Sequence, residues 1–135
     1  MASRKLIDLH PILMRKAVTF KAETELVEVE ILIYCTYRSC AEQDILFAQG
    51  RKTEGKIITW AKGGQSKHNH TENNLPASLA FDCVPMLHGR TLWEISPESL
   101  KKWQALEKIA DKLGLEWGGH FKNGKIDRPH FQITL

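Results

Sequence analysis

The chain of 135 residues carries 19 Lys and Arg against 16 Asp and Glu, which gives a formal net charge of +3. A chain of this length forms one core, so we expect a single domain over residues 1–135 without a second module. Its basic residues are scattered, and it shows neither an 18-residue apolar run nor a signal-peptide pattern. We therefore expect no nucleic-acid binding and no membrane insertion.

The first 35 residues predict a helix followed by a strand. Pro11 suits the first turn of a helix, and apolar residues from Leu13 to Phe20 recur at helical spacing. From Val27 to Ile33 apolar and other residues alternate, which is typical of a half-exposed strand.

A second helix is predicted directly after Arg38. Ser39 and Glu42 form the S-x-x-E pattern of a capping box, and Gly50 suits the end of the helix. The Arg38 guanidinium can bind a substrate carboxylate or a developing oxyanion through two parallel hydrogen bonds. The alternative is an arginine that only ties down a loop.

The middle of the chain predicts loops and strands. Residues 51–65 predict a loop with a short strand at 57–60, and the polar segment 70–76, HTENNLP, predicts a surface loop. The alternation of apolar residues from 79 to 83 predicts that Asp82 is presented from a strand.

The clearest helix signal lies in the last third of the chain. Ser96 is a good N-cap, Pro97 suits the first helical position, and Gly114 closes the helix. The tail predicts two strands around an Asn123–Gly124 turn, and the second strand carries His130.

The three cysteines, Cys35, Cys40 and Cys83, are odd in number and lack C-x-x-C spacing. This pattern favours reduced, mostly buried thiols over a disulfide framework. Cys83 as a metal ligand is the alternative.

His68, Asp82 and His130 form a candidate metal site. Two neutral imidazoles and one carboxylate are ligands that Zn²⁺ accepts while it keeps a position open for water. A turn over Arg128 and Pro129 would place the Asp127 carboxylate beside that water as a general base. The alternative is a chance arrangement, since six histidines are scattered over the chain.

Several short motifs occur in a fixed order along nearly the whole chain. They are His10-Pro11, Tyr37-Arg38-Ser39 with Glu42-Gln43, Gln49-Gly50-Arg51, Ser66-Lys67-His68-Asn69, Ala80-Phe81-Asp82, Glu116-Trp117-Gly118-Gly119 with Phe121, and Asp127-Arg128-Pro129-His130-Phe131. With them the chain resembles the small zinc peptidases of phage endolysins, the L-alanyl-D-glutamate endopeptidases, which are related to bacterial D-alanyl-D-alanine carboxypeptidases.

The resemblance implies an α+β fold of the Hedgehog/DD-peptidase type, in which a small antiparallel sheet carries a zinc site and helices pack against it. It implies that His68, Asp82 and His130 are the Zn²⁺ ligands. Asp127 is then the catalytic carboxylate, and Arg38 holds the substrate or the transition-state oxyanion.

Three further residues are implied around the substrate. Gln43 and Ser66 resemble supporting residues of the site, and Trp117 lies in the motif that resembles part of the groove. The alternative for Trp117 is a core tryptophan beside a tight glycine turn.

The implied substrate is the peptide stem of bacterial peptidoglycan, cut by a monomeric endolysin. Without a signal peptide, such an enzyme would stay in the host cytoplasm until it is released to the periplasmic wall. A D-alanyl-D-alanine carboxypeptidase and a non-catalytic peptidoglycan-binding module are the alternatives.

One departure from the family pattern S-x-H-x-x-G-x-A-x-D lies between His68 and Asp82. An insertion separates the two residues, and Ser78 stands where the family has glycine. We expect this insertion to bulge outward. The alternative is that His70 displaces one of the ligands, with Glu72 as a further oxygen donor nearby.

Overall fold

The computed structural model describes residues 1–121 and 125–135. Within them, five antiparallel strands form the main sheet in the order β1-β4-β7-β6, with β5 beside β4. The strands are β1 (Glu30–Cys35), β4 (Ala80–Leu87), β5 (Arg90–Thr91), β6 (Glu116–Trp117) and β7 (His130–Gln132).

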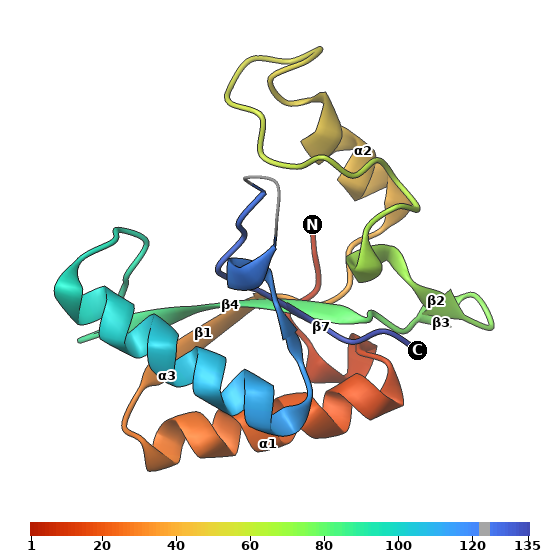
Figure 1. Cartoon of the computed structure of the whole chain (residues 1–135). Coiled ribbons are helices and arrows are strands. Elements are labelled where there is room, and N and C mark those ends of the chain that lie inside the picture. Colours follow the sequence, from red (N-terminus) through yellow and green to blue (C-terminus); the bar gives the residue numbers. More distant parts are fainter. Residues whose placement is uncertain (122–124) are drawn as a thin grey trace.

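Helices lie on both sides of this sheet. The long helices α1 (Pro11–Leu26) and α3 (Pro97–Leu113) cover one face, and α2 (Cys40–Ala48) rises above the other with the loop of residues 49–65 (Figure 1). The shorter elements are the 3₁₀ helices η1 (Leu6–Asp8), η2 (Lys67–Asn69) and η3 (Gly118–His120), and the hairpin strands β2 (Thr71–Glu72) and β3 (Leu75–Pro76).

The core fills the space between the sheet and the two long helices. Phe20 of α1, Phe81 of β4 and Phe131 of β7 are fully buried, with ring centroids 5.1–5.4 Å apart. Trp103 and Leu106 of α3 belong to the same cluster. Truncation of one of these phenylalanines to alanine would cost about 3–5 kcal/mol.

The strand pleat places the polar residues of β4 and β7 on the opposite face. Side chains alternate along a strand, so Asp82 and His130 point away from the face of Phe81 and Phe131. Asp82 lies directly opposite His130 in the pairing of β4 with β7, and opposite Cys35 in the pairing with β1. A carboxylate and an imidazole therefore meet above the sheet, below α2.

Several predicted elements are confirmed. The helix from Pro97 has its capping box at Ser96 and ends at Gly114 with φ +72°, and the second helix has the Ser39–Glu42 capping box. The insertion is an exposed hairpin whose turn is made by Asn73 and Asn74 at positive φ.

Two predicted strands differ from the structure. The first helix continues to Leu26, and Glu28 takes a positive φ of 57°, so β1 starts at Glu30 and not at Val27. Residues 57–60 form no strand, and Thr59 within them is held by hydrogen bonds from the side chains of Gln43 and Arg51. The predicted Asn123–Gly124 turn lies outside the described residues.

The described part of the chain contains no helix that is long and apolar enough to cross a membrane. Its three cysteines are free, and Cys40 alone of them is exposed. Cys83 is buried in the core on the side of the sheet away from Asp82, so the structure does not support Cys83 as a metal ligand.

Candidate metal centre and catalytic cleft

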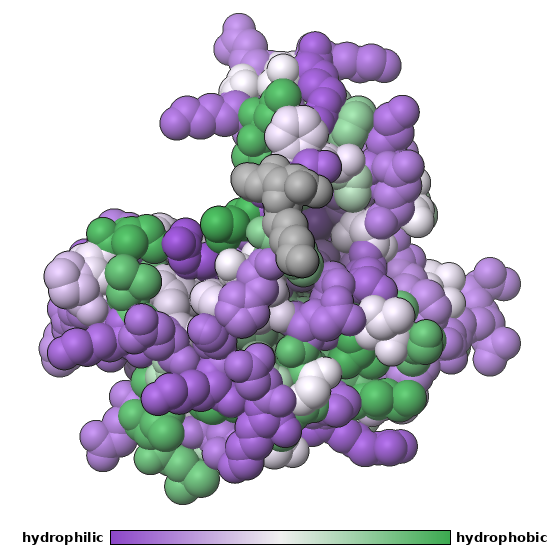
Figure 2. Space-filling view, in the orientation of Figure 1, coloured by the Kyte–Doolittle hydropathy of each residue, from purple (hydrophilic) through white to green (hydrophobic). Residues whose placement is uncertain are grey.

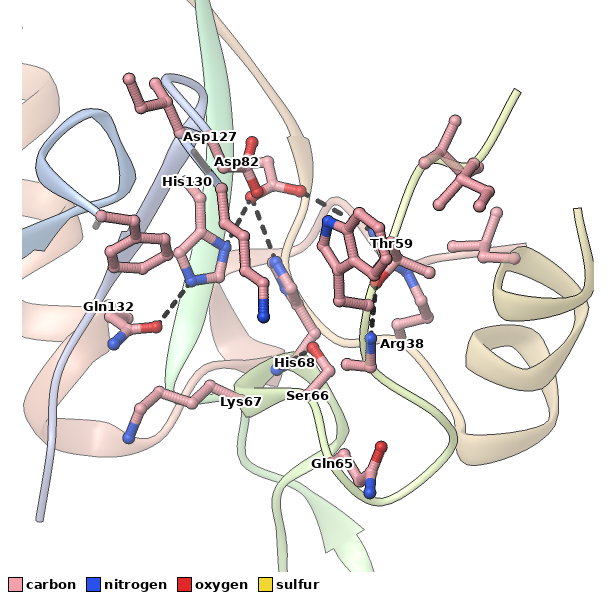
Figure 3. Close-up of a pocket in the computed structure, with 18 of the residues that line it drawn as sticks. Arg38, Thr59, Gln65, Ser66, Lys67, His68, Asp82, Asp127, His130 and Gln132 are labelled. Atoms are coloured by element: carbon pink, nitrogen blue, oxygen red, sulfur yellow. Dashed lines mark hydrogen bonds and ion pairs between the residues drawn. The ribbon is translucent and has the colours of Figure 1, made fainter. Parts of the chain in front are cut away.

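His68, Asp82 and His130 converge on one point above the sheet (Figure 3). The Oδ1 atom of Asp82 lies 3.1 Å from Nε2 of His68 and 3.2 Å from Nδ1 of His130. The three side chains come from η2, β4 and β7, and all three are buried. The structure therefore brings together the three ligands predicted from the sequence.

His68 is held with its Nε2 lone pair toward Asp82. Ser66 caps η2 by accepting a hydrogen bond from the backbone N–H of His68 at 3.2 Å. Nδ1 of His68 lies 2.8 Å from the carbonyl oxygen of Thr36. Because a carbonyl oxygen only accepts, Nδ1 carries the proton and Nε2 is free to ligate.

His130 is held with its Nδ1 lone pair toward the same oxygen. Its Nε2 lies 2.7 Å from Oε1 of Gln132, and the amide nitrogen of Gln132 donates to Glu116 at 3.0 Å. Since the Glu116 carboxylate only accepts, Oε1 of Gln132 must face His130 and receive its Nε2 proton. Nδ1 of His130 is then the ligating nitrogen.

This donor set fits a bound cation. Two imidazole lone pairs and a carboxylate oxygen face one another within about hydrogen-bond distance, which is repulsive unless a positive charge lies among them. Burial raises the pKa of Asp82, but His68 and His130 together lower it by more than burial raises it, so the carboxylate is ionised. Burial lowers the pKa of His68, but Asp82 raises it more, to about 10. In the metal-free protein a proton takes the place of the cation.

Cys35, His68 and Asp82 form a second, overlapping group of possible ligands, with ligand atoms within 4.8 Å of one another. Sγ of Cys35 lies 3.6 Å from Nδ1 of His68, which already donates to Thr36, and it accepts a hydrogen bond from Arg38 at 3.4 Å. Cys35 therefore lies on the far side of the His68 ring from the lone pair. The set with His130 fits a metal better.

Arg38 points into the site from the segment just before α2. One guanidinium nitrogen donates to Oε1 of Gln43 at 2.9 Å. The other lies 3.8 Å from Oδ2 of Asp82 (Figure 3). Gln43 is fully buried and also donates to the carbonyl of Ala61 at 2.9 Å. Gln43 thus fixes Arg38 and ties α2 to the loop that follows it.

Asp127 lies on the opposite wall and lines the same cavity. The backbone N–H of His130 donates to the Asp127 carbonyl at 3.2 Å, which is the predicted turn over Arg128 and Pro129. Burial, and then the charge of Asp82, raise the pKa of the Asp127 side chain. A raised pKa is the property expected of a carboxylate that moves protons.

A cavity of about 850 Å³ opens between the sheet and the lobe formed by α2 and residues 49–65. In the space-filling view this lobe stands above the rest of the molecule and shows apolar side chains on its surface (Figure 2). Ile57, Ile58 and Trp60 line one wall, and Phe121 and Ile126 line the other. The three candidate ligands also line it, together with Arg38, Ser66 and Asp127. A chain-like substrate can therefore lie across the metal site.

Trp117 and Gln43 are absent from the part of the cavity lining that the described residues form. Trp117 stacks on Phe131 and donates from Nε1 to the carbonyl of Arg128 at 2.6 Å. This position corresponds to the core alternative, since Trp117 supports the loop that carries Asp127. Gln43 supports Arg38 from behind.

His70 and Glu72 lie apart from the three converging ligands. His70 contacts the carbonyl of Ala77 through Nδ1 at 2.8 Å, and Glu72 lies 3.4 Å from His10. The insertion thus extends outward as the β2–β3 hairpin, as we expected, and the structure does not support His70 as a ligand.

Three features of the cleft were not predicted from the sequence. Gln132 follows His130 by two residues on β7, so the two side chains lie on the same face of the strand. Strand periodicity could therefore have placed Gln132 beside His130. Tyr34 of β1 and the wall at 57–60 reach the cleft only through tertiary packing, and no local pattern indicates them.

Two imidazoles and a carboxylate around one point, beside a carboxylate of raised pKa and an arginine, define the site of a metal-dependent hydrolase. Residues 60–133 match the family described as D-alanyl-D-alanine carboxypeptidase. The chain is 35% identical, over 131 aligned residues, to the peptidoglycan L-alanyl-D-glutamate endopeptidase CwlK of Bacillus subtilis (strain 168), and the match covers 93% of this chain and 74% of that protein. The chain belongs to this family of peptidases, which confirms the family resemblance.

A solved structure shares the fold. The L-Ala D-Glu endopeptidase ChiX of Serratia marcescens matches with a TM-score of 0.61 and 24% identity, over 99% of this chain and 89% of that one. The predicted α+β fold of the DD-peptidase type is thereby confirmed.

Proposed function

We propose that the chain is a Zn²⁺-dependent L-alanyl-D-glutamate endopeptidase that hydrolyses the peptide stem of bacterial peptidoglycan. The observation that carries this proposal is the convergence of Nε2 of His68, Oδ1 of Asp82 and Nδ1 of His130 inside a peptide-sized cleft. CwlK, a relative that aligns over 93% of this chain, is an L-alanyl-D-glutamate endopeptidase, which supports the choice of bond.

His68, Asp82 and His130 would hold the metal. Bound there, Zn²⁺ would supply Lewis-acid chemistry, acidifying water and polarising an amide carbonyl at neutral pH.

The remaining steps fall to the protein's own side chains. Asp127 takes the proton of the attacking water and later delivers it to the leaving amine nitrogen of D-glutamate. Arg38 donates hydrogen bonds to the carbonyl oxygen as negative charge develops on it. The walls of the cleft keep the scissile amide in line with both groups and exclude bulk water.

The test is to incubate the purified protein with bacterial peptidoglycan, with a chelator and with zinc restored, and to identify the new termini by mass spectrometry. We expect new N-terminal glutamate that appears only with metal. The matched control is Gln104→Ala, a surface glutamine of α3, which should cut as the wild type does.

A D-alanyl-D-alanine carboxypeptidase is the second candidate, because the family whose model matches carries that description. Release of terminal D-alanine without new N-terminal glutamate would establish it. No cleavage by a zinc-loaded protein would favour a peptidoglycan-binding module.

For the biological setting, we propose a host-lysing endolysin that is held in the cytoplasm until it reaches periplasmic peptidoglycan. This rests on the sequence resemblance to phage enzymes. A bacterial wall enzyme is the second candidate, because the relatives named above come from bacteria.

A further inference from the structure

The two histidines of the metal centre are oriented by different means. His68 donates its outer ring proton to a main-chain carbonyl, that of Thr36. His130 donates to a side chain, Gln132, which in turn donates to Glu116 (Figure 3 shows the first of these two bonds). The arrangement behind His130 thus contains two hydrogen bonds in series, and it ends at the negatively charged carboxylate of Glu116.

The sheet register builds this arrangement. Gln132 follows His130 by two residues on β7, so both side chains lie on the same face. Glu116 of β6 is the cross-strand partner of Gln132. The three side chains therefore form a row above the sheet, and backbone pairing sets their spacing.

Glu116 is itself fixed at the end of the row. Its second oxygen accepts a hydrogen bond from the hydroxyl of Thr134 at 2.7 Å, and Lys67, the neighbour of His68, lies 3.4 Å from that hydroxyl. Glu116 lies outside the cavity lining that the described residues form, so its contacts point to a structural task behind the ligand.

We propose that Gln132 and Glu116 are positioning residues for the metal. Gln132 holds the proton of His130 on Nε2 and so commits Nδ1 to the metal. Glu116 fixes the orientation of the Gln132 amide and places a negative charge two hydrogen bonds behind the ligating nitrogen, which makes the imidazole a stronger donor. This inference rests on the proposed role of His130 as a metal ligand.

The first test measures zinc affinity by competition with a chromophoric chelator. Gln132→Ala should weaken zinc binding by about 10- to 100-fold, the usual loss when an outer-shell partner is removed. Gln104→Ala should leave affinity unchanged. A Gln132→Ala protein with wild-type affinity would overturn the proposal.

The second test exchanges the two side chains. Gln132→Glu alone places two carboxylates against each other, and because like charges repel at this distance, the side chain at 132 should turn away from His130. With that hydrogen bond lost, we expect zinc to bind at least about 10-fold more weakly. Adding Glu116→Gln restores the donor, since the amide at 116 can then donate to the carboxylate at 132, and zinc affinity should return to the wild-type value or better. Equal affinities of the single and double variants would contradict the proposal.

If Gln132 and Glu116 only stabilised the fold, the double variant would not recover zinc affinity in this way. Melting temperatures of the metal-free variants show whether a substitution has destabilised the fold. In the wild type, ¹⁵N NMR of the zinc-loaded protein should show His130 protonated on Nε2. If the wild type binds no zinc, or if His130→Ala binds it as tightly, the proposed function fails. If His130→Ala loses zinc while the Gln132 and Glu116 variants keep it, only the present inference fails.

Discussion

At the scale of single residues, two carboxylates 45 positions apart in the chain, Asp82 and Asp127, lie in different electrostatic environments. The histidines hold Asp82 ionised, whereas burial and the charge of Asp82 raise the pKa of Asp127. Environments that separate the pKa values of two neighbouring carboxyl groups are typical of acid–base catalysis. We therefore propose metal binding for Asp82 and proton transfer for Asp127.

Asp127→Asn tests this assignment. The amide cannot accept the proton of the attacking water, so kcat should fall by about 10²- to 10⁴-fold. Zinc affinity should stay at the wild-type value, because Asp127 is not among the three converging ligands. The assays are peptidoglycan hydrolysis and zinc titration of the same preparation. Loss of zinc together with activity would make Asp127 a ligand.

The raised pKa of Asp127 also predicts how stability depends on pH. The folded metal-free protein binds this proton more tightly than the unfolded chain does, so the resulting stabilisation is present at low pH and is lost as the pH rises through the raised value. Asp127→Asn should therefore raise the free energy of unfolding at pH 7, measured in denaturant. ¹³C NMR titration should place the pKa of Asp127 above the ordinary value of 3.8, and a pKa at or below 3.8 would contradict this prediction.

At the scale of elements, η3 and the segment before β7 fix Asp127 and His130 through one close contact. A Cβ atom on Gly118 would lie 2.0 Å from the carbonyl oxygen of Asp127 and 3.1 Å from Cβ of His130. The Asp127 N–H also donates to the Gly118 carbonyl at 2.9 Å. Within the Glu116–Gly119 motif, Gly118 therefore allows two backbones to approach closely.

Gly118→Ala should displace Asp127 and abolish most peptidoglycan hydrolysis, because a shift of about 1 Å at a catalytic group costs about 10²-fold. Gly89→Ala is the matched control. Gly89 has φ +75° and open space around it, so alanine there should cost about 1 kcal/mol of stability and leave turnover unchanged. Activity retained by Gly118→Ala would mean that the loop tolerates displacement.

Local signals in the sequence predicted much of the secondary structure. The capping residues Ser39 and Ser96 begin α2 and α3, and Gly114 ends α3 in a left-handed conformation. Alternation from 79 to 83 placed Asp82 on a strand, and the structure places His130 opposite it. These features depend on neighbours within a few positions, so a single sequence reveals them.

Other features depend on distant contacts and could not be predicted. The loop of residues 49–65 becomes a wall of the cleft because the buried side chain of Gln43 bonds to Ala61 and Thr59. Trp117 supports a loop and lies away from the cavity because its indole reaches the carbonyl of Arg128. Neither contact can be predicted from the spacing of residues in the sequence.

At the scale of the whole molecule, a bound metal joins three segments that are far apart in the chain. η2, β4 and β7 would share one ion, so zinc should stabilise the folded protein and not the unfolded chain. At a free zinc concentration about 100-fold above Kd the gain is about 2.7 kcal/mol, seen as a rise in Tm.

Two variants show which histidines this effect requires. His68→Ala should lose the zinc-dependent rise in Tm, whereas His70→Ala, in the hairpin beside it, should keep it in full. A rise that vanishes in His70→Ala and persists in His68→Ala would mean that the insertion supplies the ligands.

The most direct test of the proposed centre is anomalous diffraction at the zinc edge from crystals of the zinc-loaded protein. We predict one peak among Nε2 of His68, the carboxylate of Asp82 and Nδ1 of His130, with Asp127 beside it. A peak beside Cys35 that lies away from His130, or a zinc-loaded protein with no peak at this site, would contradict it.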